Sequence, residues 1–284
     1  MASAELKWAT EQRFQFVEYQ AFWRGSLNRI DLTSQFGISV PQASKDLSAY
    51  QEMFPENIQY DHRQKRYFAT KDFKPHFISV DADVFLSGLI AGDHEPAQYN
   101  EIVGEAVPVP ARRVDPYVLQ AIVECISNNQ SITVLYQSMN PNRPEPQWRR
   151  ITPHSFMSDG LRWHARAYCH IDSKFKDFLL SRCIKSGDFA DPGLRVEDDL
   201  FWNKTFNVVL IPNPALSESQ QKVIATDYAM IDGEVRIPVR MAALYYFEKR
   251  LRLDIAHLVD QPGECPVVIS NRAEFELARR GATK

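Results

Sequence analysis

The sequence lacks long apolar runs and paired cysteines. Its four cysteines lie far apart, without the spacing of a zinc finger or a CxxC motif, which suits free thiols in a reducing cytosol. No apolar stretch approaches the length needed to span a bilayer. Charged residues interrupt the N-terminal segment, so we expect no signal peptide. The predicted location is therefore the cytoplasm, with no membrane partner.

The sequence also lacks a strong excess of charge and any familiar catalytic pattern. The net charge is -3 and the pI is near 6.2, so any surface for nucleic acid has to be local. No HExxH, GxSxG or phosphate-loop glycine motif is present. We therefore expect no enzyme, no metal and no cofactor. With 44% hydrophobic and 12% aromatic residues, a chain of this length can form two or three globular domains.

The first pattern along the chain is that of a helix-turn-helix. Apolar spacing predicts helices over 10–23 and 28–36, and Gly37 after the second favours a left-handed C-terminal cap. Ser39 and Gln42 have the spacing of a capping box that opens a third helix. Helix, short helix, turn and capped helix is the layout in which the last helix reads DNA.

A basic hairpin follows and completes the pattern of a winged domain. Its strands are predicted at 58–60 and 66–68, around a polar, basic tip over 61–65. Small and hydrogen-bonding side chains on the outer face of the third helix can approach bases and phosphates. One copy would neutralise few phosphates, so the modest basicity favours a dimer. The residues predicted to contact DNA are Ser39, Gln42, Ser44, Lys45, Ser48, Arg63, Gln64 and Lys65.

The stretch 148–185 alternates between apolar and polar residues and predicts three short antiparallel strands. After the turn at 158–160, apolar or small residues take every second position over 161–169, with cations, imidazoles and a phenol between them. The third strand, 177–184, places Arg182 among apolar residues, where it must be paired or reach solvent. Like charges repel on a sheet, so the cluster is either a wet, indifferent surface or a site that holds an anion.

The flanking segments predict a connector and a further α/β unit. The connector, 76–128, contains a helix over 81–90 and another that opens at Pro116, and these helices could pack in a dimer. Beyond a boundary rich in glycine, proline and acids, strand and helix patterns alternate over 205–269. This alternation fits a small α/β sandwich with helices on one face.

The order of these parts resembles the WYL-domain transcription regulators. The residues that carry the resemblance are PHSFMSDGLRWHARAYCHIDSKFKDFLLSRCIKS. Trp163 stands at the family's Trp position, His164 and Ala165 replace its Tyr and Leu, and Arg182 matches its closing Arg. The segment FGISVPQASKDLSAYQEMFP is similar to the phage-defence-associated regulators of the BrxR and CapW group.

The resemblance implies a homodimeric repressor of a phage-defence operon that binds an inverted-repeat operator in double-stranded DNA. It also implies an SH3-like small β-barrel that senses a nucleotide or oligonucleotide effector and releases DNA. The predicted fold is then α+β and multidomain. Its domains are a winged helix-turn-helix over 1–75, a helical connector over 76–128, a WYL domain over 129–190 and a C-terminal α/β sandwich extension over 200–284.

For the effector, the residues themselves suggest phosphate and base contacts. Arginine pairs with phosphate in bidentate fashion, and aromatic faces stack on bases. We expect Arg166 and Arg182 to bind phosphate, and Tyr168 to stack on a base or to lie in the core. Trp163 is expected to pack, since its strand face is otherwise apolar or small. The predicted ligand residues are Arg150, His154, His164, Arg166, Tyr168 and Arg182.

Two other functions stay open on the residues alone. An enzyme could use the histidines of this stretch with Cys169, but His164 and His170 would lie roughly 20 Å apart along one strand. A structural subunit of a defence complex could use the three helices and hairpin as a protein-interaction fold. Bound zinc would favour the first alternative, and indifference to charge reversal of the DNA-facing cations would favour the second.

Overall fold

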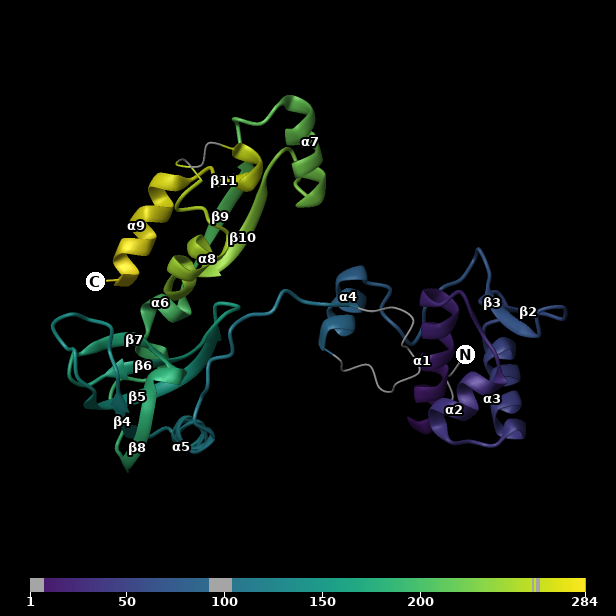
Figure 1. The fold of residues 1–284 in the computed structure, drawn as a ribbon, viewed down its shortest axis with the longest axis horizontal. Helices are drawn as coiled ribbons and strands as arrows, with labels where there is room; N and C mark the ends of the chain where they lie inside the picture. Colours follow the sequence, from purple (N-terminus) through teal and green to yellow (C-terminus); the bar gives the residue numbers. More distant parts are fainter. Residues whose placement is uncertain (1–7, 92–103, 257, 259–260, 284) are drawn as a thin grey trace. The chain divides into compact units, whose positions relative to one another are not determined.

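The computed structural model describes residues 8–91, 104–256, 258 and 261–283 (Figure 1). The fold is mixed α and β, and every strand pairing within its sheets is antiparallel in this described part. The chain divides into two compact units, Met1–Pro108 and Val109–Lys284. No helix among the described residues is long and apolar enough to cross a membrane.

The first unit contains the predicted helices and hairpin. Its described elements in chain order are α1 (Trp8–Trp23), β1 (Ser26–Leu27), α2 (Arg29–Phe36), α3 (Val40–Met53), β2 (Ile58–Asp61), β3 (Arg66–Ala69) and α4 (Ala82–Ala91).

Local capping explains where α2 and α3 begin and end. Asn28 caps α2, and Gly37 ends it with φ of 62°, as predicted for a residue without Cβ. Ser39 Oγ accepts the N–H of Gln42 at 3.3 Å. The Gln42 side chain, however, donates to the carboxylate of Asp46 at 2.9 Å. The predicted capping box is therefore only half formed, because a charged acceptor attracts the amide more strongly than the cap does.

The apolar spacing of the sequence predicts Ile30 and Val40 to face inward, but both lie outside the core of this unit. Ile30 and Val40 are 68% and 52% exposed. In α2 the inward stripe is set by Leu32 and Phe36, one turn apart, which leaves Ile30 on another side of the helix. Val40 lies in the first turn of α3, ahead of the part of the helix that reaches the core.

The hairpin is part of a three-stranded sheet of order β1-β3-β2. The short β1 was not predicted, since Gly25 and Ser26 indicated only a helix break. After the hairpin, α4 returns to α1, where Phe85 stacks on Trp23 with ring centroids 4.3 Å apart. The sequence placed this helix in a connector, whereas the structure packs it within the first unit.

The second unit holds two further sheets. Its described elements are α5 (Pro116–Ser127), β4 (Ser131–Tyr136), β5 (Gln147–Ser158), β6 (Trp163–Cys169), β7 (Lys174–Leu179), η1 (Leu180–Arg182), β8 (Cys183–Ala190), η2 (Val196–Asp198), α6 (Leu200–Asn203), β9 (Thr205–Pro212), α7 (Glu218–Asp227), β10 (Val235–Arg240), η3 (Met241–Ala243), α8 (Leu244–Arg250), η4 (Pro262–Glu264), β11 (Val267–Ile269) and α9 (Arg272–Thr283).

The first of these sheets has the strand order β7-β6-β5-β4-β8. Its two edge strands are joined by η1, a turn of three residues. Five flat strands would separate the edges by about 19 Å, whereas the chain from Leu179 to Cys183 reaches at most about 14 Å. The sheet must therefore curve. The predicted single strand over 177–184 is wrong, because η1 divides it and places Arg182 in the turn.

Helix α5 covers this curved sheet. Val118 and Ile122 pack with Ala165, Leu180 and Cys183 in one buried cluster. The apolar stripe of α5 was predicted, but its helix was assigned to the connector. The structure uses the stripe to close the core of the sheet instead.

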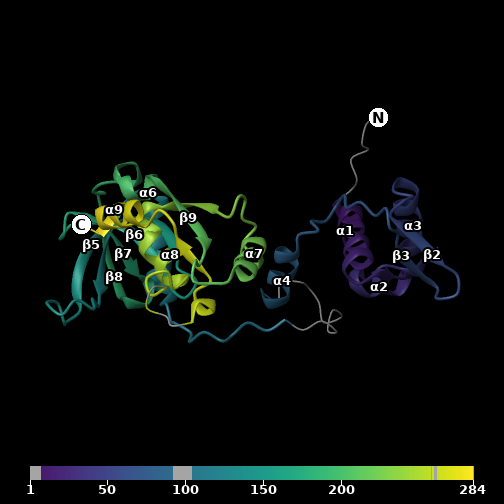
Figure 2. The ribbon, with the colours of Figure 1, turned by 90° about the horizontal axis from the view of Figure 1, so that it is seen from above.

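The last sheet has the order β10-β9-β11, with β9 in the middle. Leu244 of α8 and Phe275 of α9 are fully buried in its core, and α8 lies beside β9 in Figures 1 and 2. The spacing of Ser217 and Gln220 predicts a capping box, and this box opens α7. Apolar spacing predicts a helix over 242–253, but the helix is shorter, since η3 precedes it and it ends at Arg250. Helix α9 was not predicted.

Candidate functional site

The predicted DNA-facing residues of α3 fall into two groups. Lys45 and Ser48 are exposed on the outer side of the helix. The other three make bonds within their own helix or its cap: Ser39 caps α3, Gln42 bonds to Asp46, and Ser44 Oγ donates to the Val40 carbonyl at 3.0 Å. Lys45 and Ser48 are thus the predicted residues of α3 that are exposed and for which no bond within the helix or its cap is found among the described residues.

Asp46 holds the outer face of α3 in place from the side of the helix that faces α1. Its carboxylate is buried and forms an ion pair with Arg13 of α1 at 2.6 Å, while also accepting from Gln42. The pair ties α3 to α1. Because buried charge pairs hold a fixed geometry, the outer residues of α3 are presented on a rigid base.

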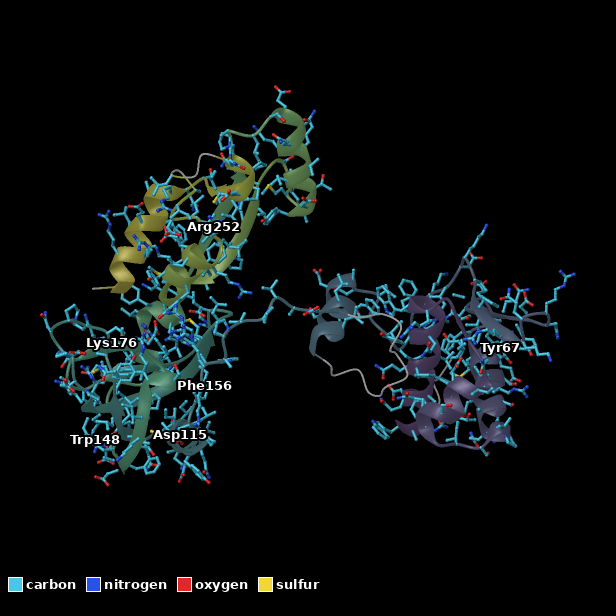
Figure 3. All side chains as sticks on the ribbon, viewed as in Figure 1. Tyr67, Asp115, Trp148, Phe156, Lys176 and Arg252 are labelled. Carbon is cyan, nitrogen blue, oxygen red and sulfur yellow. The ribbon has the colours of Figure 1, made fainter. Side chains whose placement is uncertain are left out.

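The tip of the hairpin is a polar turn with exposed cations. Asp61 Oδ1 accepts the N–H groups of Arg63 and Gln64 at 2.7 and 2.9 Å, which is an Asx-type turn. These bonds lower the pKa of Asp61. The side chains of Arg63, Gln64 and Lys65 are all exposed. Arg66 instead turns back and pairs with Asp31 at 3.2 Å. The tip therefore offers two exposed cations, Arg63 and Lys65. Tyr67, which follows the tip on β3, is labelled in Figure 3.

In the second unit, the polar face of β6 is covered. It is not the solvent-exposed surface that the alternating pattern of 161–169 allowed as one possibility. Ala165, Ala167 and Cys169 are buried as expected, but His164 and Arg166 on the opposite face are buried too. The segment after β8 and helix α8 cover that face. Trp163, expected to pack, is 56% exposed, because it stands at the first position of the strand, beyond the edge of the core.

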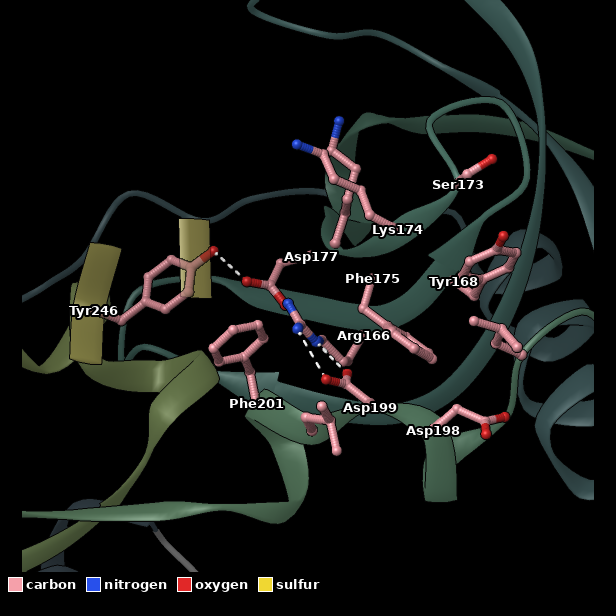
Figure 4. Close-up of a pocket in the computed structure, with 13 residues that line it drawn as sticks. Arg166, Tyr168, Ser173, Lys174, Phe175, Asp177, Asp198, Asp199, Phe201 and Tyr246 are labelled. Carbon is pink, nitrogen blue, oxygen red and sulfur yellow. Dashed lines mark hydrogen bonds and ion pairs between the residues drawn. The ribbon is translucent and has the colours of Figure 1, made fainter. Parts of the chain in front are cut away.

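Arg166 is the centre of the covered face. Its Nε and Nη2 donate to the two carboxylate oxygens of Asp199 at 2.7 and 3.2 Å, and Nη1 donates to Asp177 at 3.1 Å. The hydroxyl of Tyr246 on α8 donates to the other oxygen of Asp177 at 3.0 Å. Figure 4 shows the guanidinium between the two carboxylates. Elements that are far apart in the chain thus meet at one arginine.

His154 completes this network. Its Nε2 lies 3.2 Å from Asp199 Oδ2, and its ring is in edge contact with Trp202. Burial alone would raise the pKa of Asp199, but the hydrogen bonds from His154 and Arg166 and the charge of Arg166 outweigh it and lower the pKa to about 2. Asp199 is therefore a buried, ionised carboxylate at neutral pH.

A cavity of about 410 Å³ opens beside Arg166 (Figure 4). This size lies within the range of small-molecule sites. Its walls combine aromatic rings, cations and carboxylates, which are the groups that stack a base, bind phosphate and orient polar edges. The lining residues include Tyr168, Phe175 and Phe201, Arg166, Lys174 and Lys176, and Asp177, Asp198 and Asp199.

The structure brings together three of the six predicted ligand residues. Arg166 and Tyr168 line the cavity, and His154 contacts Asp199 beneath it. His164 lies against Tyr246, with ring centroids 4.9 Å apart. Its Nδ1 is buried and has no hydrogen-bond partner among the residues that the structure describes, and burial lowers the pKa of His164. It is not among the lining residues.

The other two predicted ligand residues lie elsewhere. Arg150 donates to Ser131 Oγ at 3.1 Å. The side chain of Arg182 interacts with the hydroxyl of Tyr136 and lowers its pKa, although burial raises it overall. Neither arginine lines the cavity, because Arg150 reaches the Asp188 carbonyl of β8 and Arg182 lies against Tyr136 of β4.

Sequence reasoning missed Asp177, Asp199 and Tyr246. Asp199 belongs to an acidic run, Glu197-Asp198-Asp199, that indicated a domain boundary. One local signal could have singled out Asp199, since aspartate is a preferred helix cap. It caps the short helix α6 by accepting the N–H of Trp202 at 3.1 Å. Which arginine it would meet depends on the packing of the domains.

A second basic cluster surrounds Asp172 in the turn between β6 and β7. Its carboxylate accepts from Arg143, Arg149 and Lys176 at 2.9, 3.1 and 2.7 Å. The hydrogen bond from Arg143, reinforced by Lys176, lowers the pKa of Asp172 strongly in spite of partial burial. The cluster stabilises the turn and keeps Arg149 paired inside the sheet.

The geometry offers no metal site within the part of the chain that the structure describes, where no group of three histidine, cysteine or acidic side chains could hold an ion. His170 bonds instead to Thr152 at 2.9 Å. The thiols of Cys125 and Cys183 have pKa values raised by burial, to about 11 and about 12. They are protonated and unreactive at neutral pH.

Family models match three parts of the chain. Residues 9–91 match the BrxR transcriptional regulator winged helix-turn-helix domain, 117–185 match the WYL domain, and 205–275 match the BrxR transcriptional regulator C-terminal dimerization domain. These ranges place α4 with the winged helix and α5 with the WYL domain, as the packing does. They confirm the predicted winged helix-turn-helix and WYL domains.

Curated relatives extend over nearly the whole chain. The DNA-binding transcriptional repressor CapW of Escherichia coli strain KTE188 is 37% identical over 275 residues, which are 95% of this chain and 91% of the relative. The repressors of the same name from Pseudomonas aeruginosa and Stenotrophomonas maltophilia are 36% and 35% identical, over 95% and 96% of this chain and 92% and 93% of theirs. The chain belongs to the CapW family. The predicted BrxR and CapW resemblance is thereby confirmed, and these relatives are named regulators rather than enzymes, as predicted for this chain.

Among solved structures, the chain is similar to the proteasome accessory factor B/C (PafBC) of Arthrobacter aurescens. The identity is 19%, and the alignment covers 97% of this chain and 49% of that longer one, with a TM-score of 0.24. At that score the comparison does not establish a shared arrangement of the domains.

Proposed function

We propose that the chain is a homodimeric, sequence-specific transcriptional repressor that binds an inverted-repeat operator in double-stranded DNA. The observation that carries this proposal is the outward face of the winged helix, where Lys45 of α3 and Arg63 and Lys65 of the hairpin tip are exposed together with Ser48. Cations at a recognition helix and a wing are the groups that neutralise DNA phosphates. The repressor name of the CapW relatives supports the same function.

The dimer follows from the match of 205–275 to a dimerization domain. Two copies double the number of phosphate contacts, and a two-fold axis in the protein requires two-fold symmetry in the operator. We therefore expect two half-sites whose centres lie about one helical turn, 34–36 Å, or a multiple of it apart.

The experiment that tests DNA binding is an anisotropy titration of the chain's own upstream promoter DNA at several salt concentrations. The proposal expects selective binding that weakens steeply as salt rises. Binding no tighter than to random DNA of the same length would overturn it. That result would favour the alternative in which the winged helix is only a protein-interaction fold in a defence complex.

We further propose that the WYL domain is an SH3-like small barrel whose 410 Å³ cavity binds a nucleotide or oligonucleotide effector. The curved five-stranded sheet and the lining by Tyr168, Phe175, Lys174 and Arg166 support this assignment. Effector binding would release the operator, and a phage-defence operon in the cytoplasm is the proposed target. Trp202 contacts His154 at the cavity's base, so a change in tryptophan fluorescence on titration with nucleotides tests the ligand class.

A further inference from the structure

Asp199 connects the cavity wall to the C-terminal domain. It lies in the segment between β8 and β9, and its carboxylate is fully buried against Arg166 of the WYL sheet. After the short helix α6, the chain enters β9 at Thr205. Only α6 and Lys204 therefore separate Asp199 from β9, which is the middle strand of the last sheet.

Arg166 is already neutralised by two carboxylates of its own chain. Of the five N–H groups of its guanidinium, one on each nitrogen donates to Asp199 or Asp177. One arginine with two carboxylates has a net charge of −1. A phosphate added to this group would therefore meet repulsion unless a carboxylate left.

The two carboxylates differ in the backbone that carries them. Asp177 lies on β7, paired in register with Arg166 itself, and accepts from Tyr246. Asp199 lies between the short helices η2 and α6, outside any strand, and also accepts the N–H of Trp202. The bidentate geometry between Arg166 and Asp199 is also the one that arginine forms with phosphate. Asp199 is the carboxylate that an incoming phosphate can replace.

We propose that Asp199 occupies the place of the effector's phosphate, a proposal that rests on the proposed effector site. Effector binding then exchanges this carboxylate for phosphate on Arg166. The exchange detaches α6 from the WYL sheet. Arg166 also lines a second cavity of about 100 Å³, together with Met241, Tyr245 and Arg279 of the C-terminal part. Arg166, the residue at which the exchange takes place, therefore lies between the proposed effector cavity and elements of the C-terminal part.

The test compares the unmodified protein with Asp199→Asn and Asp198→Asn. The second variant is a matched control, because Asp198 lines the same cavity and loses the same charge but makes no ion pair with Arg166. The probe is a fluorescent tetradeoxynucleotide with or without a 5′-phosphate. Asparagine keeps an oxygen that can cap α6, and the melting temperature of each variant shows whether it is folded.

The inference expects Asp199→Asn to bind the phosphorylated probe at least about tenfold more tightly than the unmodified protein. It expects Asp198→Asn to change that affinity less than about threefold. Adding Arg166→Lys to Asp199→Asn should abolish the gain, because lysine cannot form the bidentate contact. Asp199→Asn should also weaken operator binding without any probe.

Two results would overturn the inference in different ways. If the unmodified protein binds the phosphorylated probe and Asp199→Asn shows no gain, or gains no more than Asp198→Asn, Asp199 is not the competitor and the effector site stands. If no variant binds either probe while operator binding is normal, the effector site itself is wrong, and the exchange falls with it.

Discussion

At the scale of single residues, the structure turns predicted binding groups into paired ones. Arg166 was expected to meet a ligand phosphate, and it meets two carboxylates of its own chain. A buried arginine without partners would be too costly, since desolvation of a charge has to be offset by charge and hydrogen bonds. The sequence could predict that such an arginine needs an anion, but not which anion.

The first prediction concerns Asp199 and acid. Its pKa in the folded state, about 2, lies below its ordinary value of 3.8. Its contribution to stability is therefore fully present above about pH 4 and is lost as the pH falls toward 2. We expect this carboxylate to account for about 2 kcal/mol of the loss in unfolding free energy between pH 5 and pH 2.

Urea unfolding at a series of pH values measures this contribution. Asp199→Asn cannot titrate, so its unfolding free energy should fall less steeply over the same range, by that amount. Parallel curves for the two proteins would show that the ion pair with Arg166 does not form in solution.

The second prediction concerns Lys45, which is exposed on the outer side of α3. Lys45→Ala removes one proposed phosphate contact in each half of a dimer. The slope of log affinity against log salt should become shallower by about 0.9 for each phosphate that the variant no longer neutralises. Operator anisotropy titrations at several salt concentrations measure it, with exposed Lys185→Ala on β8 as a charge-matched control. Equal slopes for the two variants would remove Lys45 from the interface.

At the scale of elements, whether a stripe of side chains is buried or exposed depends on which other element packs over it. Strands β5, β6 and β7 are antiparallel as predicted, and α3 runs between its predicted cap and Pro55. The errors lie where an apolar or polar stripe meets an element from elsewhere in the chain. The stripe of α5 closes the WYL sheet, and the polar stripe of β6 lies under Asp199 and Tyr246.

The third prediction concerns the contact between α8 and β7. Tyr246→Phe removes the hydrogen bond of 3.0 Å to Asp177 and leaves the ring in place. Burial, together with the negative charge of Asp177, holds the pKa of Tyr246 well above its usual range, so the hydroxyl is a donor throughout the neutral range. We expect a loss of about 1 kcal/mol in unfolding free energy, or slightly more because the acceptor is charged.

Denaturant unfolding of the whole chain measures this loss. Tyr245→Phe on the same helix is the matched control, since its ring is 41% exposed and we expect its hydroxyl to be hydrated. Equal stability of the two variants would show that the contact with Asp177 contributes nothing.

At the scale of the whole molecule, DNA binding depends on the oligomeric state. The winged helix presents few cations per copy, and the dimerization match lies at the other end of the chain, over 205–275. Within that region, exposed apolar residues on or beside α7 include Val223, Tyr228 and Ile231. Exposed apolar groups that gather in one region are candidates for an interface.

The fourth prediction tests this region. Ile231→Asp places a charge on a residue that is 77% exposed and lies within the matched domain. We expect a larger monomer fraction in sedimentation velocity and a parallel loss of operator affinity. Leu277→Asp, on a residue 73% exposed in α9 outside the matched range, serves as the control. Dimers that persist equally in both variants would exclude this surface from the interface.

The sequence by itself determined the local elements and the family. Caps, glycine positions and apolar periods depend on neighbouring residues, so Gly37 ends α2 and Ser39 caps α3 as predicted. The motifs of the winged helix and of the WYL stretch are also local, and they are sufficient to indicate the family.

Only the tertiary structure decided how buried charges are paired. The partners of Arg166 come from β7 and from the segment before β9, and no spacing rule links them. It likewise decided that η1 divides a predicted strand and that Trp163 is exposed while His164 is buried. The physical reason is that a polar side chain gives the same local sequence pattern whether it faces water or is covered by another domain. Its free energy depends on the groups that packing brings to it.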